Sequence, residues 1–320
     1  MAINRRTLLA GFAVMPAMAH AAYPDRPIRI IVHFPAGGVV DVTARVVFAL
    51  LGVELGNAPI VIENVPGAGG NVATQRVARA EPDGHTLLFT TPNHTINPSL
   101  RPDPAVDVAR DFIPLSLVAQ VPEVLVAARD APFKTFQEFV DYARSHPNEL
   151  AYSSAGIGSH PHVAMELLLR QLKLKVLHVP YRGAAPALMD LVAGRVALKL
   201  DAWATSAPHI AAGTIRVLAF ASAQRAPIAP DIPTIAELGV PDFEGILWMG
   251  ALVPKGTPSD TCATLSKALA AAAKDPQVAE KLQPQGVDLI GSTPDVFQAQ
   301  IEREIPQWRE VIRAANIRPE

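Results

Sequence analysis

The fold is decided by the stretch Ile28-Arg29-Ile30-Ile31-Val32 and by the turn that follows it, Pro35-Ala36-Gly37-Gly38. The first run is short and rich in β-branched residues, which is typical of a buried strand. From Asp41 to Leu51 the apolar positions then suit a helix. A strand, a glycine turn and a helix are therefore predicted in this order, which is the repeating unit of an α/β sheet.

The same order recurs twice along the chain. A strand over 60–63, a glycine turn over 66–70 and a helix over 71–80 lead to the next strand at 86–90. A proline-rich stretch is followed by extended segments at 115–121 and 124–127 and by a helix over 136–145. A second set of elements then begins, with strands at 151–154, 176–179, 196–200 and 215–220, a turn at 155–159, and helices at 162–172 and 185–191. Alternating strands and helices predict an α/β fold whose sheets are mainly parallel and flanked by helices.

Two domains are expected because about 300 residues are more than one hydrophobic core usually serves. The late strand over 246–253, the helix over 258–274 and a last helix that starts at 293 are predicted to return to the first domain, the last helix being kinked near Pro306. The chain then crosses between the domains twice, which makes a hinge. The first domain is predicted to comprise 22–122 and 245–320, and the second 123–244.

The first 21 residues have the layout of a cleaved export signal. Arg5 and Arg6 precede an apolar run over 7–18 that is too short to span a bilayer, and small residues follow. Cleavage is expected after Ala21, which places the mature protein outside the cytoplasmic membrane. The paired arginines suit a twin-arginine exporter and a general secretory signal alike, so both routes stay open.

Composition excludes several classes of function. Hydrophobic residues make up 49% of the chain and charged residues 18%, with a formal charge of −2, so no nucleic-acid partner is expected. Cys262 is the single cysteine, which rules out an internal disulfide and thiolate metal clusters. No Asp or Glu stands at metal-site spacing beside His160 and His162, so no metal and no cofactor are predicted.

The glycine turns are the places where binding chemistry is expected. A turn that ends a strand and opens a helix presents free backbone N–H groups and the positive end of the helix dipole, both of which attract anions. The turns at 35–38 and 155–159 have this form and lie in different domains. Glycine after a strand often makes only a tight connection, but two such turns that face each other would form one anion site.

A catalytic alternative can be assembled from Ser159, His162 and Asp201 as nucleophile, base and orienting acid. The sequence around Ser159 lacks the G-x-S-x-G elbow of hydrolases with this kind of sheet, and a serine at a helix start is usually a cap. A secreted hydrolase is therefore the less favoured hypothesis, and no enzymatic activity is predicted. The glycines at 67–70 also lack the spacing of a dinucleotide-binding loop.

Six stretches resemble the Bug proteins, the receptors of tripartite tricarboxylate transporters. They follow in order and cover essentially the whole mature chain: Tyr23-Pro24-Asp25-Arg26-Pro27 through Gly38 with Asp41, Asn64 to Gly70, Pro82 to Leu88, Tyr152 to His162, His178 to Ala187, and Asp231 to Glu237. The resemblance implies a two-lobed periplasmic binding protein of the type II kind that encloses a small carboxylate. It further implies membrane components of such a transporter as partners, and we expect a monomer.

Carried over by position, the resemblance implies a set of ligand-binding residues. They are Phe34, Ala36, Gly37, Gly38, Asp41, Thr90, Thr91, Ala155, Gly156, Ser159, His162 and Asp201. Asp41 and Asp201 repel a carboxylate while ionised, so they are expected to orient water, cap helices or accept from ligand N–H and O–H groups. Simple helix capping is an equal alternative for Asp41.

The chain departs from the family pattern at several of these turns. His33 stands where the family more often has proline, His85 where it often has tyrosine, and Lys199-Leu200 where Met-Phe is common. These departures leave the identity of the carboxylate open. The sequence equally leaves open whether the receptor serves uptake or delivers its ligand to a sensor kinase.

Overall fold

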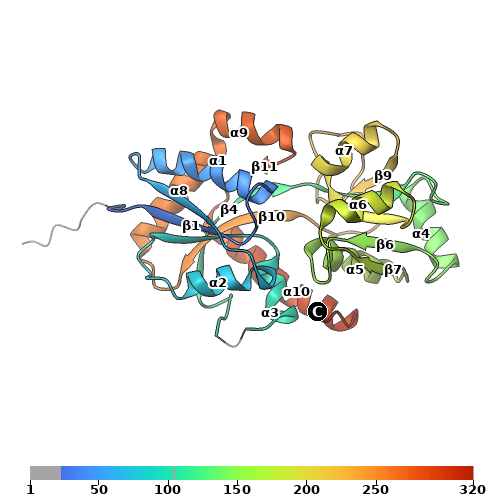
Figure 1. Ribbon diagram of the computed structural model, residues 1–320, viewed down its shortest axis with the longest axis horizontal. Helices are drawn as coiled ribbons and strands as arrows, with labels where there is room; N and C mark the ends of the chain where they lie inside the picture. Colours follow the sequence, from blue (N-terminus) through green and yellow to red (C-terminus); the bar gives the residue numbers. More distant parts are fainter. Residues whose placement is uncertain (1–22, 104, 320) are drawn as a thin grey trace, which may run out of the picture.

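The computed structural model describes residues 23–319 except for 104, and it forms two lobes side by side (Figure 1). Each lobe is built around its own sheet. The predicted signal segment 1–21 lies outside the described residues. Within them, no helix is both long and apolar enough to cross a membrane.

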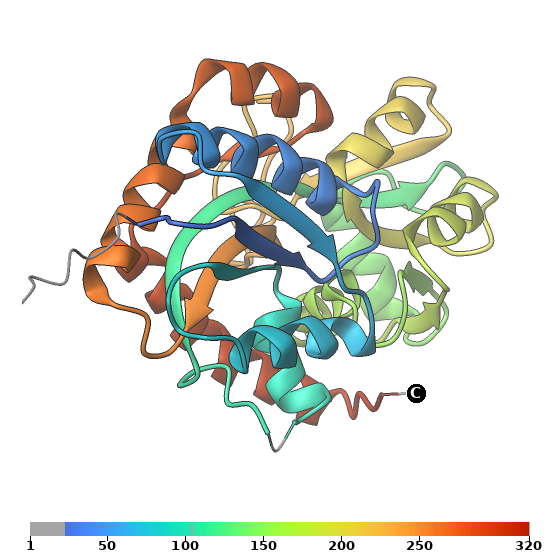
Figure 2. The same ribbon diagram turned by 60° about the vertical axis from the view of Figure 1, so that its left-hand side comes forward.

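Lobe 1 contains a six-stranded sheet in the order β11-β4-β10-β3-β1-β2. Helices α1, α8 and α9 cover one face, and α2 with the first half of α10 covers the other (Figure 2). The strands are β1 (Ile28–Val32), β2 (Ile60–Asn64), β3 (Thr86–Thr90), β4 (Phe112–Val121), β10 (Leu247–Pro254) and β11 (Asp288–Leu289). The helices are α1 (Val39–Glu54), α2 (Asn71–Ala78), α3 (Asn93–Leu100), α8 (Ser259–Lys274), α9 (Pro276–Leu282) and α10 (Pro294–Ala314).

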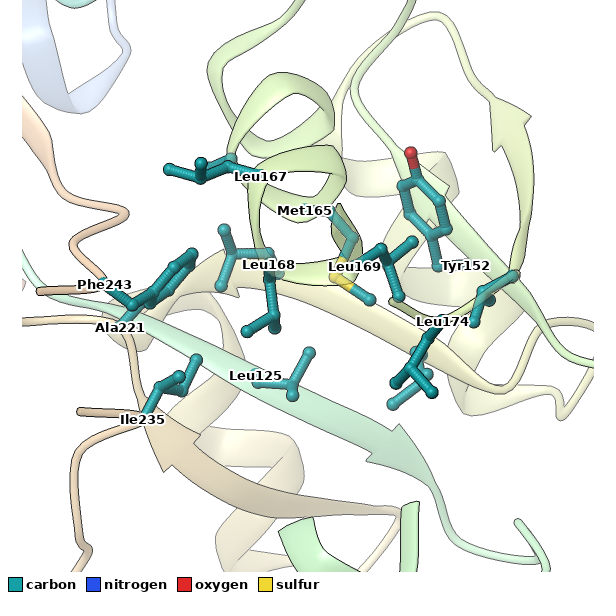
Figure 3. Packing of buried hydrophobic residues seen from close by; sticks show 14 of the residues in the cluster. Leu125, Tyr152, Met165, Leu167, Leu168, Leu169, Leu174, Ala221, Ile235 and Phe243 are labelled. Carbon is teal, nitrogen blue, oxygen red and sulfur yellow. The ribbon is translucent and has the colours of Figure 1, made fainter. Parts of the chain in front are cut away.

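Lobe 2 contains a five-stranded sheet in the order β7-β6-β8-β5-β9. Its larger core packs α4 and α5 on one face, where Leu168 of α5 lies over Leu125 of β5 (Figure 3). Helices α6 and α7 cover the other face. The strands are β5 (Glu123–Ala128), β6 (Ala151–Ser154), β7 (Leu177–Pro180), β8 (Leu198–Ala202) and β9 (Ile215–Phe220). The helices are α4 (Phe136–Ser145), α5 (His160–Leu172), α6 (Ala184–Val192) and α7 (Trp203–Ala211).

Most strands of each sheet run in one direction, as predicted. In lobe 1, β1 to β4 share a direction and β10 and β11 oppose it; in lobe 2, β5 alone opposes β6 to β9 among the described strands. Two of the reversed strands follow the crossings between the lobes. The chain enters lobe 2 through β5 and returns to lobe 1 through β10. Because they start at the junction, where the other strands end, they must run antiparallel to their neighbours.

The packing of the last helix differs from the prediction, which placed the final helices on the first domain alone. Phe297 and Ile301, in the first half of α10, lie in the lobe 1 core. Trp308, Val311 and Ile312, in its second half, belong to the large core of lobe 2. α10 therefore ties the lobes together in addition to the two strand crossings, and it runs beneath both of them in Figure 1. The structure continues the helix through Pro306.

Helix α3 occupies part of the proline-rich stretch in which no element was predicted. It carries Pro98 inside the helix, and it is rich in residues that favour turns. Its apolar side chains Ile96 and Leu100 are nevertheless buried in the core of lobe 2. Tertiary packing thus stabilises a helix that local propensity does not favour.

Candidate functional site

The register of the strands places the predicted turns on facing edges of the two lobes. β4 ends at Val121 and β5 begins at Glu123, so this point marks the junction. In lobe 2, Glu123 pairs with Ala202 at the end of β8, and β6 runs parallel to β8. In lobe 1, β10 starts opposite Val121 and runs antiparallel to β3, which is parallel to β1. The carboxyl ends of β1 to β3 and of β6 to β8 therefore all point to the junction.

The first turn of lobe 1 is organised by Asp41. Its Oδ2 accepts from the backbone N–H of Gly37 at 2.9 Å and from Arg45 Nε at 3.0 Å, and its Oδ1 accepts from Asn64 Nδ2 at 2.9 Å. Asn64 Nδ2 also donates to the carbonyl of Phe34 at 3.0 Å. The carboxylate is only 2% exposed, so it holds the turn from beneath. These contacts hold the turn that precedes α1, whereas no side chain caps the helix itself at Gly38.

The charge of Asp41 is stabilised by the same contacts. Burial by itself would raise the pKa of the carboxyl group, but the hydrogen bonds from Arg45, Gly37 and Asn64 outweigh burial and hold the pKa below its usual value. The carboxylate is therefore ionised at neutral pH. Because it already accepts the N–H of Gly37, that amide is not free for a ligand.

The backbone amides of lobe 1 that have no acceptor begin at the residue after Gly37. Gly38 is the N-cap of α1, and the first amide with a helical partner is that of Val42, which donates to the carbonyl of Gly38 at 2.9 Å. Among the described residues, nothing accepts from the N–H groups of Gly38, Val39 and Val40. Ala36, Gly37 and Gly38 are exposed. This helix start can therefore receive an anion at its backbone.

Thr90 and Thr91 lie at the end of β3, beside the same edge. Both are buried, and Thr91 Oγ1 lies 3.2 Å from His33 Nε2. His33 sits directly beneath Gly70, where a Cβ atom would be 2.5 Å from its Nδ1. Burial, with a smaller effect of the nearby His94, lowers the pKa of His33 to about 3. His33 is thus a neutral packing group under the second glycine turn.

In lobe 2 the turn at 155–159 is held by hydrogen bonds to its own backbone. Ser154 Oγ accepts from the N–H of Gly156 at 3.2 Å, and Ser159 Oγ donates to the carbonyl of Gly156 at 2.7 Å. His162 Nδ1 accepts from the N–H of Gly158 at 2.9 Å. The amides of Gly156 and Gly158 are therefore used within the turn. That of Ile157 donates to no acceptor in the described part of the chain.

His162 and His178 stack face to face behind this turn, with ring centroids 3.7 Å apart. Burial, and next the proximity of His178, lowers the pKa of His162 to about 3, and burial lowers that of His178 to about 4. Both rings are neutral at physiological pH, so each can accept a hydrogen bond. His178 Nε2 lies 2.7 Å from Ser154 Oγ. The pair therefore positions the turn.

The catalytic alternative does not assemble. Ser159 donates to a backbone carbonyl, and His162 Nδ1 is taken by the amide of Gly158. Asp201 forms an ion pair with the buried Lys199 and accepts from the hydroxyls of Thr205 and Ser206 at 2.8 and 2.9 Å. None of the three side chains is bonded to another. No three His, Cys, Asp or Glu side chains within residues 23–319 are grouped as a metal site requires.

Sequence reasoning missed the residues through which the turn of lobe 2 contacts lobe 1. A Cβ atom on Gly158 would come within 1.9 Å of Leu100 Cδ2, at the end of α3. The neighbouring Arg101 donates from Nη2 to the carbonyl of Ile157 at 3.5 Å. The only signal in the sequence was one basic residue in a proline-rich stretch. The contact joins the predicted ligand turn of one lobe directly to the other.

Two cavities lie at the junction, but neither is lined by the glycine turns. One of about 430 Å³ lies between α5, α10 and the crossing segment at Ile246, and one of about 650 Å³ lies between Pro122, Ser222 and α9. The smaller cavity is bordered by Glu304, whose buried carboxylate accepts from Trp248 Nε1 at 2.8 Å. These cavities belong to the hinge, whereas the free amides belong to the strand ends.

Comparison with known proteins agrees with this geometry. A family model described as "Tripartite tricarboxylate transporter family receptor" matches residues 43–317. The chain belongs to this receptor family. Protein BugT of Bordetella pertussis (strain Tohama I) is 34% identical over 320 residues, which cover 97% of this chain and 98% of BugT. The resemblance to the Bug proteins is thereby confirmed.

Solved structures of similar receptors share the fold. The periplasmic binding protein BugD is 34% identical with a TM-score of 0.75, over 93% of this chain and all of BugD. Rpa4515 of R. palustris, solved with adipate, is 35% identical with a TM-score of 0.78, over 93% of this chain and 100% of Rpa4515. MatC from Rhodopseudomonas palustris, solved with malate, is 35% identical with a TM-score of 0.75, over 91% of this chain and 100% of MatC. The chain is thus a two-lobed solute-binding receptor and not an enzyme.

Proposed function

We propose that this receptor captures a small carboxylate between its lobes, outside the cytoplasmic membrane, and presents it to the membrane components of a tripartite tricarboxylate transporter. The observation that carries the proposal is the set of free amides at Gly38, Val39 and Val40, which face the junction at the start of α1. A carboxylate accepts hydrogen bonds from such amides and is favoured by the helix dipole.

The two relatives whose names include a ligand support the chemical class. Adipate and malate, the ligands of Rpa4515 and MatC, are both small carboxylates. In our proposal the ligand first meets the turn of one lobe, and rotation about the crossings at Pro122 and near Ile246 brings the turn at 155–159 onto its other side. We place the lobe boundaries at these two crossings.

The predicted site residues take different parts in this proposal. Gly38 offers a free amide, Thr90 ends a strand at the junction, and Ala155 begins the opposite turn. Gly37, Asp41, Gly156, Ser159 and His162 act by shaping the turns, since their polar groups are bonded within them. Asp201 shapes the start of α7 in the same way.

The test uses the protein without residues 1–21 and a thermal-shift panel of small carboxylic acids. A ligand at 100 times its Kd adds about 2.7 kcal/mol to the stability of the folded state. The uncharged amides of the same acids serve as matched controls and are expected to leave the melting temperature unchanged. A panel in which no acid shifts the melting temperature overturns the proposal.

A single backbone substitution identifies the site. Val39→Pro removes one N–H at the first position of α1, where proline is tolerated, and Gly38 already has the extended conformation that proline requires before it. We expect the Kd of a bound acid to rise about tenfold, because one hydrogen bond to a charged group is lost. Ser259→Pro, at the same position of α8, is the matched control.

Delivery to a transporter is tested separately from binding. Pull-down of the closed, acid-loaded receptor with candidate membrane components is expected to exceed pull-down of the unloaded receptor. Retention by the periplasmic domain of a sensor kinase, with none by transporter components, would favour the sensing alternative. We further propose that the receptor acts as a monomer, which size-exclusion chromatography with light scattering checks.

A further inference from the structure

The hinge cavity is a space of about 430 Å³ between α5, α10 and the crossing segment at Ile246. No residue of the glycine turns lines it, so it is separate from the turns that present the free amides. Lobe 2 contributes side chains of α5 and of the loop before Ile246, and lobe 1 contributes side chains of β10 and α10. Pockets that bind small molecules typically have volumes of about 300–1,000 Å³. The cavity is therefore large enough for a small ligand, which would touch both lobes.

The lining of the hinge cavity carries an excess of negative charge. Its charged side chains are the carboxylates of Asp242, Glu244 and Glu304 and a single cation, Arg303. Arg303 Nη2 is paired with Glu244 Oε2 at 2.9 Å. Asp242 and Glu304 form no ion pair with a described residue, so two negative charges remain without a cation. An occupant with a positive charge is therefore favoured over one with a negative charge.

One of these charges is fixed in the interior by Glu304, which is 6% exposed. Both carboxylate oxygens accept hydrogen bonds, and all of the donors are neutral. They are Trp248 Nε1 at 2.8 Å, Gln300 Nε2 at 3.0 Å, Thr95 Oγ1 at 2.6 Å and Trp308 Nε1 at 3.3 Å. Neutral donors hold the carboxylate in place without cancelling its charge. The cost of burying that charge is therefore lowered further when a cation enters the cavity.

His160 provides a second and independent indication of a ligand. It lines the hinge cavity and is 3% exposed. Its Nδ1 lies 3.4 Å from Glu123 Oε2, and neither atom has a hydrogen-bond partner within residues 23–319. The nearby carboxylate favours the tautomer with its hydrogen on Nδ1, which leaves the lone pair of Nε2 for a donor in the cavity. Buried polar groups without hydrogen bonds are rare in folded proteins, and an occupant with N–H groups accounts for this one.

We propose that the hinge cavity is a second ligand site, which takes a small organic ammonium ion. The ammonium group donates to His160 Nε2 and to the carboxylate of Asp242, and the buried charge of Glu304 favours it electrostatically. The apolar part of the ligand packs against Leu167 and Ile246, which line the same cavity. Because the glycine turns lie outside this cavity, an ammonium ion and a carboxylate can be bound at the same time.

The experiment is isothermal titration of the mature receptor with benzylammonium chloride at constant ionic strength. Benzyl alcohol is the matched probe, because it has the same ring and carries a neutral hydroxyl group in place of the ammonium group. Saturable binding of benzylammonium is expected, with a Kd at least about tenfold below that of benzyl alcohol, since hydrogen bonds to a charged group are lost in the alcohol. The titration is repeated with the acid that gives the largest thermal shift, and the Kd of benzylammonium is expected to change by less than about twofold.

Variants of the lining change its charge in both directions. Gln171 of α5 is exposed and lines the cavity. Gln171→Glu is expected to tighten benzylammonium binding by about two- to fivefold, and Gln171→Lys and Asp242→Asn to weaken it by the same factor, the range for partly solvated charge pairs. His160→Phe keeps the ring but removes the acceptor, so binding is expected to weaken by about tenfold. Gln277→Lys is the matched control, because Gln277 is exposed on α9 and does not line the cavity.

Three results would overturn the inference. The first is benzyl alcohol that binds as tightly as benzylammonium, or no saturable binding of the cation. The second is a Kd that stays the same in all of the lining variants or changes equally in Gln277→Lys. The third is competition between the acid and benzylammonium, which would place the cation between the lobes at the carboxylate site. Melting temperatures show that the variants are folded. Failure of the proposed function is distinguished from these results, because it appears only in the panel of acids.

Discussion

The substitution Asp41→Asn measures how strongly the first turn of lobe 1 is held. The buried carboxylate accepts from Gly37, Asn64 and Arg45. An amide keeps one acceptor oxygen but presents an NH2 group where a donor already points. At least one charge-assisted hydrogen bond is therefore lost, and such a bond contributes about 1.5–3 kcal/mol. The share of Arg45 is smaller, because its side chain is 51% exposed.

We expect the free energy of unfolding to fall by about 2 kcal/mol, which lowers the melting temperature by about 4–8 °C. Differential scanning calorimetry measures this, and Asp130→Asn is the control, since Asp130 is exposed and forms no hydrogen bond with a described residue. Acid affinity is expected to fall in parallel because the turn that presents Gly38 loosens. Equal melting temperatures for the two variants would refute the account of Asp41 as the organiser of this turn.

The pH dependence of the same variant follows from the lowered pKa of Asp41. The folded state keeps this carboxylate ionised at lower pH than the unfolded state does, so its stabilisation is complete above the ordinary pKa of about 3.9 and is lost as the pH falls through the lower folded value. The difference between wild type and Asp41→Asn should therefore be constant near neutral pH and shrink in acid. A difference that grows below about pH 4 would contradict this sign.

Three further predictions concern the core and the junction. Gly158→Ala places a Cβ against Leu100 at a positive φ and should destabilise the protein by about 2–4 kcal/mol in thermal unfolding, with part recovered on adding Leu100→Ala. Glu304→Gln weakens a buried acceptor of two tryptophans and should cost about 2–3 kcal/mol in urea denaturation, whereas the exposed Glu302→Gln should cost almost nothing. The pKa of His162 in the folded protein is about 3, below its ordinary value. The neutral His162 therefore contributes its full stabilisation above about pH 6.5, and this contribution is lost as the pH falls towards 3. His162→Gln should make the free energy of unfolding less sensitive to pH between about 7 and 4.

The fold was predictable wherever local pattern and tertiary burial agree. The run Ile28–Val32 and the glycine turn after it are a strand and a helix start in the structure, as predicted. Helix α3 was missed because Pro98 and its polar neighbours indicate a loop, while Ile96 and Leu100 find their partners in the other lobe. Packing against a distant part of the chain cannot be predicted from the local sequence.

The site was predictable as a location but not in the roles of its polar groups. The order of strands and turns indicated that glycine turns meet at the strand ends. No pattern, however, shows that Asp41 accepts the amide of Gly37 or that His162 accepts that of Gly158. The contact of Arg101 with the other lobe was missed for the same reason, because its guanidinium group lies where Gly69 and Gly158 leave space for it.

The position of α10 bears on the order in which the protein folds. The strands of lobe 2 are complete by Phe220, yet its core still lacks Trp308, Val311 and Ile312, which are synthesised long afterwards. A ribosome-bound or partly translocated chain therefore exposes an apolar surface on α5 until its final helix arrives. The native state is therefore reached only at the last stage of synthesis. A chain that ends just before Trp308 leaves the core of lobe 2 incomplete, and one that ends before Phe297 leaves the cores of both lobes incomplete.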